Sequence, residues 1–301
     1  MELQKVILYY AFTPLTDPEA IRLWQFTLAQ ELNLKGRVLI SKHGINGTLG
    51  GNMSDLKKYV SATKKYEGFK EIDFKWSEGT GNDFPRLKVK VKEELVEFGR
   101  PVNVLVNESG VVNGGKHLKP HEVNRLVAER GKEVFFFDGR NSYEAKIGKF
   151  KNALVPNVSH TRDFVSEIKS GKYDYLKENP IVTYCTGGIR CEILSSVLIE
   201  QGFKEVYQIE GGIVRYAQKY GDDALWQGSL YTFDKRMTLD FSDHTPVLGK
   251  CEKCDEATKQ FYNCAKISCH SLILLCDTCA SVETNKGCIH EFQMQGAEMI
   301  G

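Results

Sequence analysis

The sequence has no long hydrophobic run, no internal repeat and no low-complexity tract. No apolar stretch approaches the roughly 20 residues needed to span a bilayer, which argues against a membrane protein. The apolar run near the N-terminus ends by Phe12 and is too short and too aromatic for a signal peptide. With 40 Lys and Arg against 39 Asp and Glu, the chain also lacks a strong net charge, so any basic surface must be local. We therefore expect a cytoplasmic protein with no membrane partner.

Cysteine is nearly absent from the first 250 residues, where only Cys185 and Cys191 occur. The other seven cysteines lie between residues 251 and 288. In a reducing compartment, such crowding indicates metal or redox chemistry more than structural disulfides. The sequence thus has two separate regions in which sulfur chemistry is expected.

The first hundred residues alternate between strand and helix patterns. Strands are expected at 6–12, 37–40 and 72–76, with a glycine-punctuated strand after residue 43. Asp17 before Pro18 predicts the start of a first helix, Gly36 its end, and Ser54 the cap of a second helix. The resulting βαββαβ order predicts a ferredoxin-like (acylphosphatase-like) sandwich over residues 1–100.

A lysine stripe runs along the segment 87–93. Leu87, Val89 and Val91 alternate with Lys88, Lys90 and Lys92, so a strand would place the lysines on one face. Two interpretations stay open, a solvated face or a phosphate-contacting stripe. In the second interpretation this module binds RNA, and the candidate contact residues are Lys42, Arg86, Lys88, Lys90 and Lys92.

The central part of the chain predicts a parallel α/β domain. Turn-forming residues over 101–120 suggest a connector, and the domain itself is expected over 121–222. Its expected helices are 121–130, 162–170 and 192–201, and its expected strands are 134–137, 181–184 and 205–208. Strands that alternate with helices imply a parallel sheet covered on both faces.

Cys185 follows the β-branched run 181–184 and begins a short loop. The loop continues with Thr186, Gly187, Gly188, Ile189 and Arg190. Two glycines let the backbone curl so that several N–H groups point at one spot near a helix N-terminus. A thiolate there would have a depressed pKa and be reactive at neutral pH, and Arg190 would add a positive charge able to hold an anionic substrate group. The competing interpretation is a buried structural cysteine at a strand end.

Residues around this loop resemble the rhodanese family. Asp138-Gly139-Arg140-Asn141 with Glu144 resembles its first signature, and Glu210-Gly211-Gly212-Ile213 resembles its closing segment. Four residues separate Cys185 from Arg190, whereas related phosphatase loops carry one more, which favours a sulfur intermediate over a phosphate. The resemblance implies that Cys185 is the catalytic nucleophile and carries a persulfide.

Three further features occur along the chain: Gly44-Ile45-Asn46-Gly47-Thr48 in the first module, the loop from Cys185 to Glu192, and the Cys-rich tail. In this combination the chain resembles the oxygen-dependent tRNA uridine 5-hydroxylases. The resemblance covers nearly the whole chain and implies 5-hydroxylation of the wobble uridine. It implies a tRNA partner recognised at its anticodon region and molecular oxygen as a substrate; no flavin, haem or iron motif is evident. The alternatives are a sulfurtransferase that uses a Cys185 persulfide, and a non-catalytic metal-bearing RNA-binding adaptor. Oligomeric state is left open.

Two points of mechanism also stay open. The Cys185 thiolate would either add to uridine C6, making C5 nucleophilic, or deliver oxygen from an oxidised form of its sulfur. Cys191 lies six residues later. In one interpretation it resolves an oxidised or persulfidated Cys185 or lines the site. In the other it packs structurally at the start of the helix.

The tail over 223–301 contains two Cys-x-x-Cys pairs, Cys251 with Cys254 and Cys276 with Cys279. Further donors are available at Cys264, Cys269, His270, Cys288 and His290. Nine candidate donors are enough for two zinc ions, and metal binding would supply folding energy that a short tail lacks. The competing interpretations are a partly disulfide-linked tail or a loosely ordered one.

Overall fold

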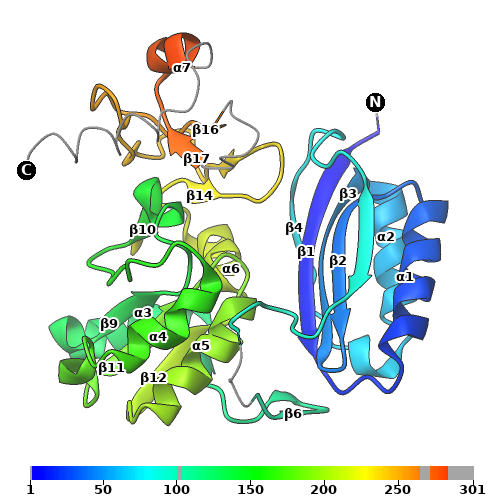
Figure 1. The fold of residues 1–301 in the computed structure, drawn as a ribbon, viewed down its shortest axis with the longest axis horizontal. Helices are drawn as coiled ribbons and strands as arrows, with labels where there is room; N and C mark the ends of the chain where they lie inside the picture. The colour runs from blue at the N-terminus through cyan, green and yellow to red at the C-terminus, as the bar shows by residue number, and fades with distance from the viewer. Residues whose placement is uncertain (1, 100–103, 265–271, 284–301) are drawn as a thin grey trace, which may run out of the picture.

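The computed structural model describes residues 2–99, 104–264 and 272–283. Figure 1 shows three parts: an N-terminal module, a central α/β domain, and a small C-terminal region that lies against the central domain. Within the described residues, no helix is both long and apolar enough to cross a lipid bilayer.

The N-terminal module is a five-stranded sheet with two helices on one face. Its strands, in the spatial order β4-β1-β3-β2-β5, are β1 (Gln4–Phe12), β2 (Lys35–Ser41), β3 (Gly44–Asn52), β4 (Lys75–Glu78) and β5 (Leu87–Val91). The helices are α1 (Pro18–Glu31) and α2 (Met53–Thr63). The first four strands pair antiparallel in the ferredoxin-like order, so that prediction is confirmed. Strand β5 adds to the edge, parallel to β2.

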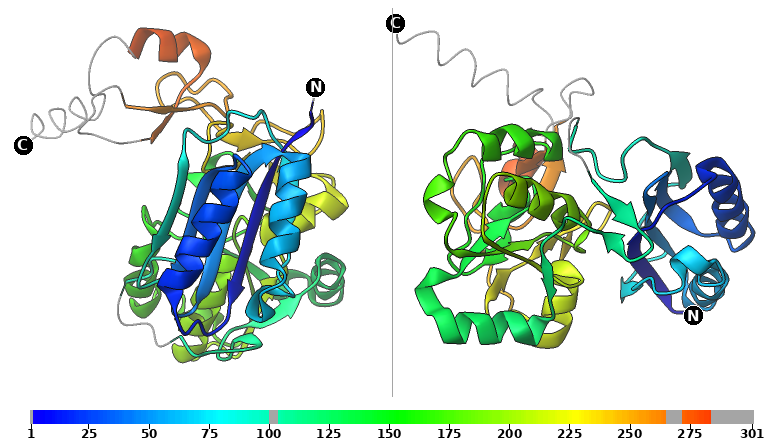
Figure 2. Two further views of the ribbon diagram at one scale, coloured as in Figure 1. Left: turned by 90° about the vertical axis from the view of Figure 1, so that its right-hand side faces the viewer. Right: turned by 90° about the horizontal axis from the view of Figure 1, so that it is seen from below.

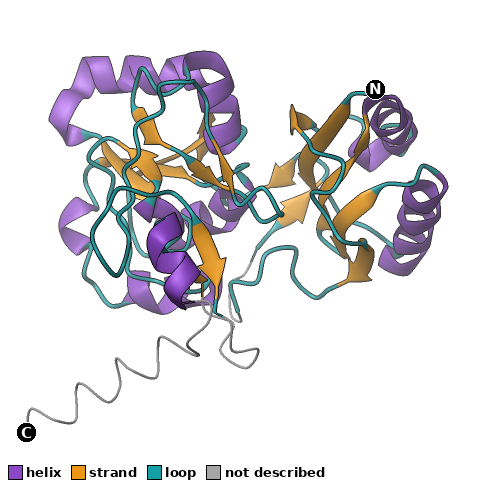
Figure 3. Cartoon of the chain, turned by 90° about the horizontal axis from the view of Figure 1, so that it is seen from above, coloured by secondary structure: helices purple, strands orange, loops and turns teal. Residues whose placement is uncertain are grey.

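The two faces of this sheet have different coverings. The side chains of Ile7 and Tyr9 join the core beneath the helices, and the period of two sends Leu8 and Tyr10 to the opposite face. Figure 1 and Figure 3 show that this opposite face is turned toward the central domain. The sheet is therefore packed on both sides.

Of the three predictions about helix ends in this module, one is confirmed and two need correction. Asp17 does cap α1, since its carboxylate accepts from the N–H groups of Glu19 and Ala20. The helix ends before Gly36, however, because Asn33 already adopts the left-handed conformation and Gly36 lies inside β2. Helix α2 begins at Met53 with Asn52 at its N-cap, not Ser54.

The strand expected at 72–76 begins only at Lys75. Glu67–Phe69 forms a 3-10 turn, and Ile72 and Phe74 are then buried in the core before the backbone pairs with β1. Burial of two large apolar side chains therefore gave a strand-like pattern to a segment that is mostly irregular.

The central domain is built on a four-stranded parallel sheet in the order β8-β12-β11-β9. These strands are β8 (Lys116–Leu118), β9 (Phe135–Asp138), β11 (Pro180–Tyr184) and β12 (Glu205–Ile209). The helices are α3 (Pro120–Arg130), α4 (Phe164–Lys169), α5 (Ile189–Glu200) and α6 (Gly212–Tyr220). Strand β8 lies within the expected connector, which also contains the short hairpin of β6 (Val106–Asn107) and β7 (Gly110–Val111).

Both faces of the parallel sheet are covered, as expected. Phe137 and Ile181 pack with α4 and α5, and Phe136 and Val182 pack with α3 and α6. All five residues of β11 are buried, so Cys185 emerges from the centre of the sheet. Helix α5 begins at Ile189, three residues earlier than expected, directly after the glycine pair.

The C-terminal region consists of short strand pairs and one helix. Strand β10 (Gly148–Phe150) pairs with β13 (Trp226–Gly228), β14 (Leu230–Tyr231) with β15 (Thr238–Leu239), and β16 (Phe261–Asn263) with β17 (Leu272–Leu274). Helix α7 spans Asp277–Glu283. A small apolar cluster that includes Ile147, Tyr231, Phe261 and Leu274 anchors the region on the central domain. Figure 2 shows the ribbon of the C-terminal region beside that of the central domain.

Strand β4 and the residues just before it lie at the contact between the N-terminal module and the central domain. The Arg215 guanidinium forms an ion pair with Asp73, and Gln218 donates to the Trp76 carbonyl at 3.0 Å. Arg236 of the C-terminal region donates to Ser77 Oγ at 2.9 Å. Polar contacts from two other regions thus fix this edge of the sheet beside the loop of Cys185.

Candidate active site

The loop after β11 wraps closely around the Cys185 sulfur. Gly188 has φ +104°, a conformation that side chains oppose, and its N–H donates to Cys185 Sγ at 3.2 Å. The Arg190 N–H donates to the same sulfur. The expected ring of inward-facing amides is therefore present at the N-terminus of α5.

The glycine pair at the start of α6 lets that helix contact the loop. Gly211 and Gly212 both have positive φ, and a Cβ on Gly212 would lie 2.4 Å from the Cys185 carbonyl oxygen. Without that side chain, α6 approaches closely enough for Ile213 N–H to donate to the Cys185 carbonyl at 2.9 Å. The closing segment Glu210–Ile213 therefore serves to position the loop backbone.

Cys185 is stabilised as a thiolate. Burial, at 1% exposure, would raise its pKa, but several groups together outweigh this effect. The Cys191 thiol donates to the sulfur, the Arg190 charge attracts it, and the two loop amides donate to it, which lowers the pKa of Cys185 to about 6. At neutral pH the ionised, nucleophilic form predominates.

Cys191 is fully buried on the first turn of α5, in contact with Cys185. Burial, its hydrogen bond to Cys185 and the charge there raise the pKa of the Cys191 thiol well above its usual value. The two sulfurs thus differ in protonation: the Cys191 thiol stays protonated and donates a hydrogen bond, and Cys185 carries the negative charge.

Arg190 is held by an acidic partner. Its two terminal nitrogens donate to the two carboxylate oxygens of Glu144 at 2.6 and 3.0 Å, and one also reaches Thr186 Oγ1 at 3.2 Å. Glu144 is completely buried, and its charge is the main favourable influence that raises the pKa of Arg190 against the cost of burial. Arg190 therefore acts as a fixed charge beside the sulfur, and its terminal nitrogens are already occupied by Glu144.

A second buried ion pair supports the first. Arg140 donates to the two Asp138 oxygens at 2.9 and 2.6 Å, and Tyr184 Oη donates to Asp138 at 2.7 Å. The first signature therefore places a second buried ion pair behind the loop. The Asn141 N–H of the same signature donates to Glu144 Oε1 at 3.0 Å, which helps to position Glu144 and, through it, Arg190.

The N-terminal sheet forms a roof over the loop, which the sequence analysis did not predict. A Cβ on Gly187 would lie 2.7 Å from the Leu8 side chain, and one on Gly188 would lie 2.9 Å from Tyr10 Oη. Tyr10 Oη donates to Glu192 at 2.9 Å. The available signal was the apolar character of Val6, Leu8 and Tyr10, which alternate with core residues and indicate a strand buried on both faces.

Lys75 is the charged member of this roof. It is only 3% exposed, and its ammonium group lies 5.1 Å from the centre of the Tyr10 ring. Burial lowers the pKa of Lys75, while Asp73 and the Cys185 charge act in the opposite direction. A lysine from the first module therefore contributes positive potential at the sulfur of the second.

A cleft of about 320 Å³ opens between the roof and the central domain. It reaches Thr186 of the loop, and Arg86 and Lys88 of the lysine stripe line it. Lys42, Lys90 and Lys92 are exposed but do not line it. Further basic lining comes from Arg37, Lys75 and Arg236, against a single carboxylate, Asp234.

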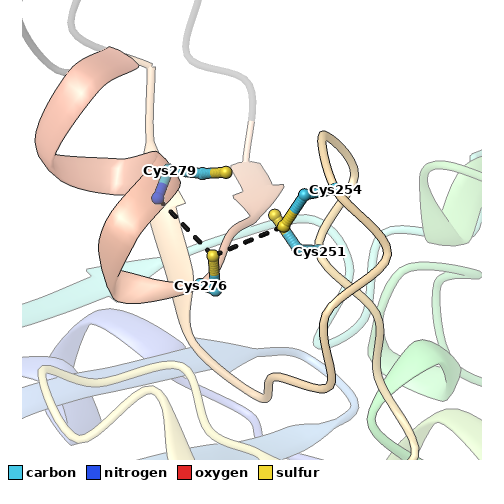
Figure 4. A group of neighbouring side chains, drawn as sticks. All are labelled: Cys251, Cys254, Cys276 and Cys279. Atoms are coloured by element: carbon cyan, nitrogen blue, oxygen red, sulfur yellow. Dashed lines mark hydrogen bonds between the residues drawn. The ribbon is translucent and has the colours of Figure 1, made fainter.

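The two Cys-x-x-Cys pairs of the tail converge in space. The sulfurs of Cys251, Cys254, Cys276 and Cys279 all lie within 4.8 Å of one another, and Figure 4 shows them facing a common centre. Cys254 and Cys276 are separated by 3.6 Å between their sulfurs, close to the spacing in a tetrahedron of Zn–S bonds of about 2.3 Å. This four-sulfur cluster is a candidate metal centre.

The remaining predicted donors do not join it. Cys264 is partly buried and packs against the apolar cluster next to the four sulfurs, outside the quartet. Cys269, His270, Cys288 and His290 lie outside the described residues.

Three family models match successive parts of the chain. They are a UPF0176 acylphosphatase like domain over residues 4–95, a rhodanese-like domain over 119–219, and a Rhodanase C-terminal region over 227–291. Among solved structures, a rhodanese-like domain protein from Staphylococcus aureus is 22% identical over 36% of this chain and 95% of its own, with a TM-score of 0.29, too low to support the assignment further.

Full-length relatives have a common name, tRNA uridine(34) hydroxylase. The protein from Corynebacterium jeikeium is 59% identical over 99% of this chain and 96% of its own. Those from Corynebacterium efficiens and an Arthrobacter species are 58% and 57% identical over 94% and 93% of this chain and 92% and 96% of their own. At this identity and coverage, the chain belongs to the tRNA uridine(34) hydroxylase family.

Proposed function

We propose that this protein hydroxylates C5 of uridine 34, the wobble position of the tRNA anticodon, in an oxygen-dependent reaction that uses Cys185. The observation that carries the proposal is the ionised sulfur of Cys185, buried beside a basic cleft that two modules build together. The family relatives supply the substrate: their shared name specifies uridine 34 of tRNA. Since tRNA is used by ribosomes in the cytoplasm, the enzyme would act there.

The roof over the loop favours this activity over simple sulfur transfer. A sulfurtransferase must present its persulfide to a donor and an acceptor, whereas here Leu8, Tyr10 and Lys75 cover the loop and leave a cleft lined by cations. A polyanion with one base inserted into a pocket fits that shape better than a small sulfur donor does.

Both chemical routes start from the same thiolate. It either adds to uridine C6, which makes C5 nucleophilic toward oxygen, or becomes oxidised and delivers oxygen to C5. Trapping a covalent RNA adduct at Cys185 would select the first route. An oxidised Cys185 that transfers its oxygen without a C6 adduct would select the second.

Cys191, together with Cys185, can supply the two electrons that the reaction with dioxygen requires. When dioxygen places one atom on C5, the other becomes water only if two electrons and two protons are supplied. The thiols of Cys185 and Cys191 are hydrogen-bonded neighbours, and their oxidation to a disulfide supplies both. The C5–H bond, O₂ and two thiols thus yield C5–OH, water and one disulfide.

The test is mass spectrometry of tRNA nucleosides after incubation of the protein with unmodified tRNA under ¹⁸O₂. We expect 5-hydroxyuridine that carries one ¹⁸O atom and, without added reductant, one Cys185–Cys191 disulfide per turnover. With thiosulfate added as a sulfur donor, the appearance of thiolated uridine instead would establish sulfur transfer. Hydroxyuridine without ¹⁸O from the gas would rule out oxygen as the source.

The four-cysteine cluster is proposed to hold one structural zinc ion. Four cysteine thiolates at tetrahedral spacing are the donor set of closed zinc sites, which have no open position for substrate. Backbone N–H groups of Lys253 and Cys254 donate to Cys251 Sγ, as expected for a loop that wraps around a metal-bound sulfur. The zinc would fold the tail and take no part in the chemistry at Cys185.

A further inference from the structure

One row of side chains crosses the whole N-terminal sheet on the face without helices. Strand register pairs Lys75 with Leu8, Leu8 with Thr48, Thr48 with Arg37, and Arg37 with Lys88. Residues directly opposite one another on neighbouring strands share a face, so these five side chains form a continuous line. All five line the cleft, and the row therefore leads from the outer edge of the sheet to the catalytic loop.

The outer end of the row carries cations that form no ion pair with any residue that the structure describes. Arg37 and Lys88 are adjacent exposed residues, and Arg86 precedes Lys88 on the same edge. In the described part of the chain, none of these three side chains forms an ion pair. In contrast, Lys75 and Arg236 deeper in the cleft are paired with Asp73 and Asp234. The free positive charge is thus concentrated at the entrance.

The inner end of the cleft carries an exposed aromatic ring. Phe233 is 56% exposed and lines the cleft, with the Arg190 guanidinium 5.6 Å from its ring centre. The buried Tyr231 meets it edge to face at 5.1 Å. Exposure of a phenylalanine to water is unfavourable, and a ring packed against Tyr231 beside the reactive loop is suited to stack on a flat ligand.

We infer that this cleft binds a single-stranded RNA segment, with the target base stacked on Phe233 and the flanking phosphates on Arg37, Arg86 and Lys88. The inference rests on the proposed function and deepens it, because it assigns the substrate site. A volume of about 320 Å³ lies in the range of small-ligand pockets, which suits one nucleotide. The base must leave its stack to approach the covered sulfur, which an unpaired loop permits more easily than a duplex.

Phosphate contacts are tested by removing charge from the two faces of the sheet. The double variant Arg37→Ala/Lys88→Ala changes the cleft, and Lys57→Ala/Lys65→Ala removes the same charge from exposed positions on or next to α2. Binding of a 17-nucleotide anticodon stem-loop is measured as a function of salt. We expect the cleft variant to bind more weakly and its log K against log salt slope to flatten by roughly 1.4, about 0.7 for each lost contact with single-stranded RNA. The helix-side control should match the wild type.

Stacking is tested by a cycle that pairs Phe233→Ala with an RNA lacking the base at position 34. Loss of the ring should weaken binding of the normal stem-loop by roughly 5- to 150-fold, and Phe233→Trp should restore it. The abasic RNA should bind wild type and Phe233→Ala equally. If Phe233→Ala weakens both RNAs to the same degree, the base does not lie on this ring and the assignment is overturned.

The outcomes separate this inference from the proposed function. Hydroxylation with unaltered binding in the cleft variants would overturn the site and leave the activity standing. Binding that depends on Arg37, Lys88 and Phe233, without any hydroxyuridine from the wild type, would retain the RNA site and overturn the activity. Thermal melts and the thiolate absorbance of Cys185 verify that each variant is folded.

Discussion

The two groups of cysteines in this chain use sulfur in opposite ways. In the catalytic loop one sulfur is ionised: Cys191, Arg190 and two amides all stabilise negative charge on Cys185. In the tail four sulfurs lie within 4.8 Å of one another, and backbone N–H groups, not a guanidinium, lower the pKa of Cys251. The first arrangement isolates a single charge and makes it reactive. The second would bring together up to four like charges, which requires a metal ion to be stable.

The difference shows that the surroundings of a cysteine decide its chemistry. Cys185 has positive and hydrogen-donating neighbours fixed by two buried ion pairs, Arg190 with Glu144 and Arg140 with Asp138. The tail cysteines sit in a small apolar cluster of their own that includes Ile273 and Leu275. Variants that remove one sulfur should therefore have separable effects, on activity in one group and on folding in the other.

The largest effect is expected from Cys185→Ala. Because both chemical routes need this sulfur, hydroxyuridine formation should fall to the background of a reaction without enzyme, measured by nucleoside mass spectrometry. Zinc content and melting temperature should stay close to wild type, since Cys185 is not one of the four candidate zinc ligands. Hydroxyuridine produced at an appreciable rate by this variant would eliminate both routes.

Cys276→Ser should have the next largest effect, on metal content. Loss of one of four ligands opens the site, so bound zinc measured on protein purified without chelators should drop from about one per chain toward zero. The tail should then become sensitive to protease while the Cys185 thiolate persists. Cys264→Ser is the matched control, because this partly buried cysteine lies outside the quartet and its change should leave zinc bound. Equal zinc loss in both variants would contradict a four-cysteine site.

The two cysteine sites could largely be predicted from local sequence. The glycines after Cys185 and the Cys-x-x-Cys spacing are short-range signals, and a loop or knuckle is completed within a few residues. The ferredoxin-like order also followed from strand and helix periodicity. These features depend on neighbours along the chain, and a single sequence contains that information.

The roof could not be predicted, since it depends on how two modules meet. Leu8, Tyr10 and Lys75 have no motif; they reach the loop because β1 and β4 present them on the face turned toward the central domain. Glu144 stands out in the sequence only as part of a family signature, because its bidentate contact with Arg190 spans 46 residues of sequence. The lysine stripe was identified, but only tertiary structure separates Lys88 in the cleft from Lys90 and Lys92 outside it.

Glu144→Gln should have the third largest effect. It separates the contribution of Glu144 to folding stability from its influence on the pKa of Cys185. It leaves Arg190 buried without its counter-charge, and breaking a buried ion pair costs about 3–5 kcal/mol, which thermal or urea unfolding would detect. With the carboxylate gone, the Arg190 charge acts on Cys185 with less cancellation, so the thiol pKa should fall further. Glu129→Gln, at an exposed position, should change neither quantity. A rise in the Cys185 pKa would mean that Glu144 supports the thiolate mainly by placing Arg190.

The smallest effect, and the most specific, concerns the proton of Cys191. The Cys185 thiolate should be lost as pH falls through about 6 and be fully formed above it, as seen in the 240 nm absorbance of wild type minus Cys185→Ala. Cys191→Ala removes a hydrogen-bond donor to the charged form, so the midpoint should move upward by roughly one to two pH units, given about 1.5–3 kcal/mol for a hydrogen bond to a charged group. Cys191→Ser retains a donor and should move it less. An unmoved midpoint in both variants would show that Arg190 and the loop amides alone hold the charge, and that Cys191 contributes only as a reductant.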